Sequence, residues 1–191
     1  MKTLNTYITE WKAKTSTMSS INTQCFIYKL KPYYHKIKIF NIRWAQFEEY
    51  KDKVYINGKH VKIDNNGLTL NDYEPGTYKV YIEDIDNVTN CHCMFYDCIH
   101  LISVPLFDTS KVENMSAMFC NCCELTNVPL FDTSNCEGMY QMFYRCKKLK
   151  NVPLFDTSKV VDAYQMFYDC DSLNEQTKQE WSSVYDFETN K

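Results

Sequence analysis

The sequence is short of glycine, proline, long apolar runs and charge of one sign, and each shortage excludes a class of protein. Four glycines and five prolines among 191 residues exclude a collagen-like chain and argue against extensive disorder. No apolar run is long enough to cross a membrane. The formal net charge of −3 gives no general attraction to phosphate backbones or anionic lipids. We therefore expect no nucleic-acid partner and no membrane insertion.

Signatures of catalysis are also missing. The sequence contains no phosphate-binding loop, no dinucleotide fingerprint and no HExxH zinc motif. The histidines are scattered, and none recurs in one frame with a nucleophile and an acid: His35, His60, His92 and His100. The sequence therefore predicts a protein that is not an enzyme and that has no catalytic residues and no cofactor.

Residues 1–14 read MKTLNTYITEWKAK and contain no continuous apolar stretch that could act as a secretory signal. Their apolar side chains instead fall at i, i+3, i+4 and i+7, which predicts one stripe of an amphipathic helix: Leu4, Tyr7, Ile8 and Trp11. Residues 15–23 are rich in serine and threonine, which is typical of a linker. We expect synthesis in the cytoplasm without a signal peptide, and an N-terminal helix and linker over residues 1–23.

The dominant feature of the sequence is an internal repeat of 24 residues. Three full copies follow one another without insertion, at residues 94–117, 118–141 and 142–165. A fourth copy begins at Met166 and soon departs from the pattern, and a half copy precedes the first, at residues 83–93. Chance does not produce such a period, so we expect one structural unit per copy, stacked on its neighbours.

The first part of each copy predicts a very short strand. In the first copy Leu101, Val104 and Leu106 form the pattern L-x-x-V-x-L, in which alternate side chains point inward. The same pattern recurs in the next two copies, at Leu125, Val128 and Leu130 and at Leu149, Val152 and Leu154.

The second part of each copy predicts a turn and a short helix. Asp108, Thr109 and Ser110 end the strand and supply N-cap chemistry. The spacing of a capping box is present twice, in Ser110 with Glu113 and in Ser134 with Glu137. Apolar residues then recur on one helical face: Val112, Met115, Met118 and Phe119.

Stacking of such units places equivalent residues in columns inside one core. The expected structural columns are Cys98, Cys122, Cys146 and Cys170; Leu101, Leu125, Leu149 and Leu173; and Phe107, Phe131 and Phe155. Both ends of the stack then need covers, and residues 174–191 are expected to form a C-terminal capping helix that uses Trp181, Val184, Tyr185 and Phe187.

The repeated frame M-F-x-x-C-x-x-L-x-x-V-P-x-F-D-T-S-x-V-x-x-M resembles the BspA-like leucine-rich-repeat surface proteins, a bacterial, protist and phage-borne family related to the Treponema-type repeats. The resemblance covers residues 83–173. It implies a solenoid used for adhesion or protein–protein contact, without catalytic residues. The expected fold class is α+β: a short leucine-rich-repeat solenoid of strand–turn–helix rungs, capped by a small β-rich N-terminal domain and a C-terminal helix.

Residues 24–82 lack the repeat and predict the small antiparallel β-rich domain. Apolar residues alternate in several short stretches, such as residues 26–30, 54–56 and 78–82. Asn57-Gly58 between two of these stretches is a strong signal for a β-hairpin. A helix is expected around residues 44–50.

Ten cysteines allow three interpretations. Cys91-x-Cys93 and Cys120-x-Cys122-Cys123 have the spacing of zinc-ligand pairs. Disulfides are a second possibility, which the lack of an export signal disfavours. We favour the third, buried free thiols, because four cysteines share one repeat position; no metal site is predicted. Asp108, Asp132 and Asp156 likewise predict Asx-turns to the residues that follow them, in preference to a calcium site.

Two sets of repeated polar and aromatic residues are candidate binding residues. Tyrosines share two repeat positions, Tyr96, Tyr144 and Tyr168 at one and Tyr140 and Tyr164 at the other. They either pack between rungs or form an aromatic stripe that contacts a partner. The predicted strands offer a second surface, formed by Ser103, Asn127 and Asn151 beside Pro105, Pro129 and Pro153.

We conclude from the sequence that this is a non-enzymatic recognition or structural module for adhesion-type contacts with a protein or a surface glycan, and self-association is compatible with it. Because virions assemble in the cytoplasm and act outside it, a phage virion or tail component fits a surface-type repeat without an export signal. An intracellular protein–protein scaffold is the alternative, and a zinc-binding cysteine-rich protein is a third hypothesis.

Overall fold

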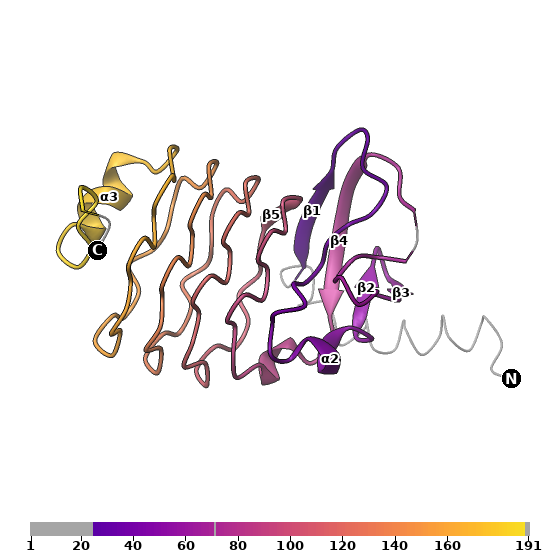
Figure 1. Ribbon diagram of the computed structural model, residues 1–191, viewed down its shortest axis with the longest axis horizontal. Helices are drawn as coiled ribbons and strands as arrows, with labels where there is room; N and C mark the ends of the chain where they lie inside the picture. The colour runs from indigo at the N-terminus through magenta and orange to yellow at the C-terminus, as the bar shows by residue number, and fades with distance from the viewer. Residues whose placement is uncertain (1–24, 71, 190–191) are drawn as a thin grey trace, which may run out of the picture.

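The computed structural model describes residues 25–70 and 72–189. Figure 1 shows an elongated body with a sheet at one end, a row of parallel coils in the middle and the short helix α3 at the other end. The amphipathic helix and the linker predicted over residues 1–23 lie outside the described residues.

The sheet has five strands in the order β3-β2-β4-β1-β5, and every neighbouring pair is antiparallel. The strands are β1 (Phe26–Leu30), β2 (Val54–Ile56), β3 (Lys59–Val61), β4 (Gly76–Ile82) and β5 (Leu101–Ser103). The hairpin predicted at Asn57-Gly58 is confirmed, since these two residues join β2 to β3. Both have positive φ, 48° and 80°, as a two-residue type I′ turn requires. The helix expected around residues 44–50 is the short α2 (Phe47–Tyr50).

Strand β5 belongs both to this sheet and to the repeats. It pairs antiparallel with β1 on one side, and on the other Ser103 bridges to Asn127 in parallel. Asn127 bridges in the same way to Asn151. We call this side of the stack the sheet wall and each 24-residue circuit a coil. The sheet wall continues the N-terminal sheet into the stack. The described residues before the repeats (25–70 and 72–82), which we call the N-terminal module, therefore cover the first coil of the stack.

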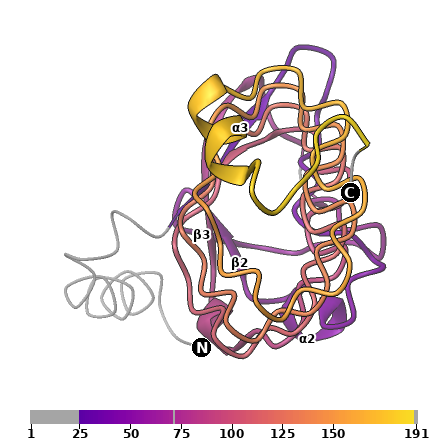
Figure 2. The ribbon, with the colours of Figure 1, turned by 90° about the vertical axis from the view of Figure 1, so that its left-hand side faces the viewer.

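The opposite side of the stack is also held by hydrogen bonds between coils, although its backbone is a series of tight turns. In each coil alternate N–H groups donate to carbonyl oxygens of the next coil, as Met115, Ala117 and Phe119 do at 2.9, 2.7 and 2.9 Å. Asn114, Gly138 and Asp162 form parallel bridges along the same side. We call this side the turn wall. Figure 2 shows the coils superimposed end-on, with the two walls facing each other.

The predicted fold class, an α+β leucine-rich-repeat solenoid of strand–turn–helix rungs, is wrong. Residues 83–173 contain one short strand, one 3-10 turn (η2, Ile85–Asn87) and no α-helix. The capping boxes Ser110/Glu113 and Ser134/Glu137 therefore precede turns. The predicted C-terminal capping helix is reduced to the seven residues of α3 (Glu175–Trp181), followed by further turns.

Left-handed residues explain why the turn wall is not helical. Ala117, Gln141 and Gln165 share one repeat position and have φ of 54°, 52° and 55°. Asn121 and Arg145 share a second position and have φ of 63° and 59°. An α-helix cannot continue through such residues. The N–H groups that a helix would bond within itself are turned toward the next coil instead.

The core between the walls consists of columns of equivalent side chains. Phe95, Phe119, Phe143 and Phe167 stack with near-parallel rings, with centroids 5.6, 5.7 and 5.7 Å apart in turn. All four are buried, and so are the phenylalanine column Phe107, Phe131 and Phe155 and the leucine column Leu101, Leu125, Leu149 and Leu173. Equivalent apolar side chains of neighbouring coils are thus buried against one another, and this burial stabilises the stack.

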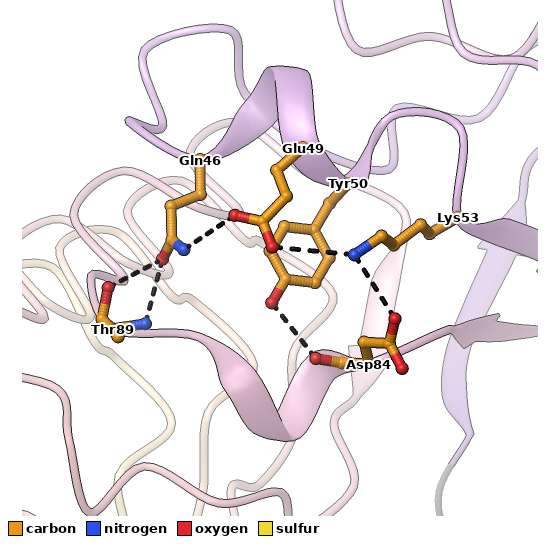
Figure 3. A network of polar contacts seen from close by, with 6 residues as sticks. All are labelled: Gln46, Glu49, Tyr50, Lys53, Asp84 and Thr89. Atoms are coloured by element: carbon orange, nitrogen blue, oxygen red, sulfur yellow. Dashed lines mark hydrogen bonds and ion pairs between the residues drawn. The ribbon is translucent and has the colours of Figure 1, made fainter.

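The first coil is covered by the segment that contains α2. The carbonyl groups of the first coil have no preceding coil to bond to, so this segment supplies the donors. The backbone N–H of Asn41 donates to Met94 O at 2.9 Å, and the Trp44 indole donates to Asn90 O at 2.5 Å. Figure 3 shows the polar network beside these contacts. Gln46 Oε1 accepts from the Thr89 N–H at 3.0 Å, and the Tyr50 hydroxyl donates to Asp84 O at 3.1 Å.

The last coil is covered by aromatic side chains from and after α3. Phe167, the end of the phenylalanine column, contacts the rings of Trp181, Tyr185 and Phe187 at centroid distances of 5.2, 5.2 and 5.6 Å. The Trp181 indole also donates to Val152 O at 3.1 Å. The two ends are thus closed by hydrogen bonds and apolar contacts that an open stack would lack.

Candidate functional site

The four repeated cysteines are all buried in the core. Their thiols donate to main-chain oxygens of the preceding layer: Cys122 to Phe95 at 3.1 Å, Cys146 to Phe119 at 3.0 Å and Cys170 to Phe143 at 2.9 Å. Cys98 donates to Ile39 at 3.5 Å in the N-terminal module. Burial raises the pKa of each of these thiols, so they stay protonated at neutral pH.

All ten cysteines of the chain are free and lie in the described part of the chain. The described residues also contain no group of three or more His, Cys, Asp or Glu side chains arranged to hold a metal ion. The repeated thiols hydrogen-bond to the backbone inside the core, and the pairs Cys91/Cys93 and Cys120/Cys122 belong to no such group.

The repeated aspartates form the predicted Asx-turns, which are confirmed. The carboxylates of Asp108, Asp132 and Asp156 accept from the backbone N–H of the serine two residues later, at 2.9, 3.0 and 2.9 Å. Hydrogen bonds from these serines hold the pKa of each carboxyl below its usual value. All three side chains remain exposed and carry negative charge at neutral pH.

The outer surface of the turn wall carries the repeated tyrosines. Tyr144 and Tyr168 stack with centroids 5.1 Å apart and an interplanar angle of 11°, and Tyr140 and Tyr164 stack at 6.2 Å and 22°. Tyr140, Tyr164 and Tyr168 are 37%, 42% and 40% exposed. The four side chains define what we call the tyrosine patch, on the last two coils of the stack.

Tyr96 does not join the tyrosine patch. The equivalent residue in the next coil is Cys120, which separates Tyr96 from Tyr144 by one coil. Tyr96 and Tyr144 pack against a small buried cluster of Cys93, Ala117 and Cys120. The predicted aromatic stripe is therefore interrupted, and its exposed rings are concentrated at the C-terminal end.

Charged residues that the sequence analysis did not single out border the tyrosine patch. The Arg145 guanidinium lies over the Tyr144 ring, 5.2 Å from its centroid, and contacts Asp169 at 3.6 Å. Lys147 pairs with the same carboxylate at 3.4 Å. A stacked arginine holds the aromatic face in place and offers hydrogen-bond donors at its edge. The sequence signal for it is the M-F-Y-R variant of the repeat.

The sheet wall places Ser103, Asn127 and Asn151 in one row. Asn127 and Asn151 are exposed, whereas Ser103 is half-buried. Asn151 accepts a hydrogen bond from the Asn174 side chain, so the end of the row belongs to the C-terminal cover. The row is polar, and its two asparagines are open to solvent.

Three leucines that were predicted to point into the core lie on the surface instead. Leu106, Leu130 and Leu154 follow the prolines of the sheet wall and are 56%, 60% and 45% exposed. Only one short strand forms in this region, so the inward–outward alternation assumed for L-x-x-V-x-L does not reach its last residue. The adjacent phenylalanines Phe107, Phe131 and Phe155 take the buried position.

Comparison with known proteins identifies one family. The family described as "Mycoplasma protein of unknown function, DUF285" matches residues 78–181, more than half of the chain. No curated protein and no solved structure matches the chain. None of the helices in the described residues has the length and apolar character needed to cross a membrane.

Proposed function

Because the chain belongs to the DUF285 family, a repeat-type family of unknown function, we propose that it is a non-enzymatic binding module whose ligand is held by the tyrosine patch. The observation that carries this proposal is the pairwise stacking of four tyrosines on successive coils, three of them exposed. Tyrosine combines a large apolar ring with a polar tip and few rotatable bonds, which suits it to contact surfaces.

The rigidity of the patch supports the same proposal. The carbonyl oxygen of each tyrosine accepts a hydrogen bond from the preceding coil, as in the Gln141 N–H to Tyr164 O contact of 3.0 Å and the Arg145 N–H to Tyr168 O contact of 2.8 Å. Little ordering of the backbone is then needed when a ligand binds, which favours affinity. A ligand with apolar faces and hydroxyl or amide groups, such as a surface glycan or a protein loop, matches this chemistry.

We infer an adhesion-type role, in which the patch contacts a protein or glycan at a cell surface or in a phage virion; the rival role is an intracellular protein–protein scaffold. The resemblance of the repeat frame to surface proteins supports the first role. Mass spectrometry of surface-labelled cells and of purified virions distinguishes the settings: recovery of the protein from neither would favour the scaffold.

The binding role is tested with an array of surface glycans and extracellular proteins. The double variant Tyr164→Ser/Tyr168→Ser should lose the binding that the unaltered protein shows, while its unfolding transition stays in place because both rings are partly exposed. Tyr33→Ser is the matched control, since Tyr33 is 96% exposed on the N-terminal module. Equal binding by the double variant and the unaltered protein would contradict the proposal.

A further inference from the structure

The exposed leucines Leu106, Leu130 and Leu154 form a continuous apolar row, which we call the leucine stripe. One leucine projects from each coil at the same repeat position, and no described residue buries them. Leu106 and Leu130 lie in a shallow groove with Phe107, and its remaining lining residues are Asp86, Asp108, Thr109 and Asp132. An apolar row of this kind on a surface is typical of a docking site.

The groove has one sign of charge. Its lining contains three aspartates and no basic side chain, and Asp156 continues the row on the third coil. Asp132 lies close enough to both Asp108 and Asp156 for the three carboxylates to repel one another. Lys111 and Lys159 lie near the ends of the row and offset part of this charge. A segment that presents apolar side chains flanked by lysines would contact the leucines with the former and the aspartates with the latter.

The chain enters the described structure beside this groove. Ile27 of β1 pairs antiparallel with Ser103 of β5, so extending the register by two residues brings Cys25 level with Pro105, next to Leu106. The rings of Phe26 and Phe107 are 6.1 Å apart, which places the start of β1 against the groove residue that follows Leu106. The described part of the chain therefore begins beside Leu106, at one end of the leucine stripe.

The sequence before Cys25 has the required chemistry. Leu4, Tyr7, Ile8 and Trp11 share one face at helical spacing, and Lys12 and Lys14 fall on either side of that face. Residues 1–14 contain three lysines and one glutamate, a net charge of +2. A helix advances about 5.4 Å per turn, close to the spacing of about 4.8 Å between paired strands, so successive turns match successive leucines.

The intervening segment is long enough. Residues 15–24 span up to roughly 30 Å when extended. The leucine stripe covers two coil spacings, or about 10 Å. We propose that residues 2–14 of this chain dock on the leucine stripe, with Leu4, Tyr7, Ile8 and Trp11 against the leucines and Lys12 and Lys14 beside the aspartate row.

Tryptophan fluorescence tests this docking in the full chain. The protein has three tryptophans, and two of them, Trp44 and Trp181, are each 1% exposed. The difference in acrylamide quenching between the unaltered protein and the Trp11→Phe variant therefore reports on Trp11 alone. We expect Trp11 in the unaltered protein to be quenched much less than in a free peptide of residues 1–14. The double variant Leu106→Ser/Leu130→Ser should raise its quenching to the level of the peptide, and Asp132→Asn or added salt should raise it in part.

Leu70→Ser is the matched control, because Leu70 is 50% exposed and outside the stripe, and it should leave Trp11 protected. The buried tryptophans check folding, since their emission stays blue-shifted in any variant whose core is intact. Peptide-like quenching of Trp11 in the unaltered protein would overturn the proposal. Protection that depends on protein concentration, with a doubled mass in sedimentation, would also overturn it, because the stripe would then bind a second copy.

Discussion

The thiol of Cys122 donates a hydrogen bond of 3.1 Å to the carbonyl oxygen of Phe95, which lies 27 residues earlier and one coil away. The same contact recurs at Cys146 and Cys170 with the phenylalanine 27 residues before each. A side chain of each coil thus bonds to the backbone of the preceding one in the middle of the core.

Thiol titration checks this arrangement. In the native protein only the half-buried Cys25 and Cys123 should react quickly with a disulfide reagent, because burial shields the other eight thiols. For the repeated cysteines burial also raises the pKa. All ten should react after unfolding in urea. Rapid reaction of more than two thiols in the folded protein would show that the core is open.

Replacement of a left-handed residue by glycine should stabilise the protein. Gln165 has φ of 55°, a conformation that costs an L-residue roughly 1 kcal/mol relative to glycine. Gln165→Gly should therefore raise the free energy of unfolding by up to about 1 kcal/mol. The gain is reduced by loss of the hydrogen bond that the Gln141 side chain donates to the Gln165 side chain. Urea denaturation measures the change. Tyr164→Gly, at a neighbouring residue without positive φ, should be destabilising, and an equal response at both positions would contradict the explanation.

Glu124 joins the N-terminal module to two coils through ion pairs with Lys31 at 2.6 Å and Lys148 at 2.7 Å. Burial raises the pKa of the Glu124 carboxyl, but hydrogen bonds from the two lysines outweigh it and the net pKa is lowered. A lowered pKa contributes stability above the usual glutamate value and loses it as the pH falls through the folded value.

Glu124→Gln should consequently cost about 1 kcal/mol near neutral pH. The difference from the unaltered protein should shrink below about pH 4.3 and vanish in stronger acid. Urea denaturation at a series of pH values measures it. A difference that grows with acidity would show that the carboxylate is not the stabilising form.

The C-terminal cover is tested at Trp181. Its indole N–H donates to Val152 O, and its ring meets Phe155 and Phe167 at 5.6 and 5.2 Å. Trp181→Phe keeps most of the apolar contact but removes the donor, so we expect a loss of about 1–2 kcal/mol in the free energy of unfolding. Val184→Ala, at an exposed position of the same segment, should change it little. Similar effects of both changes would argue against a specific cap.

The 24-residue period of the sequence predicts which side chains lie together in the core. Residues 24 positions apart occupy equivalent environments, which is why the cysteine, leucine and phenylalanine columns could be written down from the sequence. The Asn57-Gly58 turn was predictable for a local reason, because few residue pairs accept two successive positive φ values.

The turn wall could not be predicted in the same way. Its left-handed positions are occupied by residues such as Ala117, Gln141 and Arg145, which carry no sequence signal for positive φ, and the apolar spacing of Met115, Met118 and Phe119 is equally compatible with a helix. Bonding to neighbouring coils decides between the two, and that is a tertiary interaction. The exposure of Leu106 was missed because the strand was assumed to extend through Pro105.

Each coil satisfies its backbone through contacts with the coil before and the coil after, and only the two covers recognise particular ends. The body is therefore extensible: duplication of one 24-residue copy in the gene would lengthen it by one layer and leave both covers unchanged. Such a change would add a row to each outer wall. The number of repeat copies in the gene then determines the area of outer surface that the molecule presents.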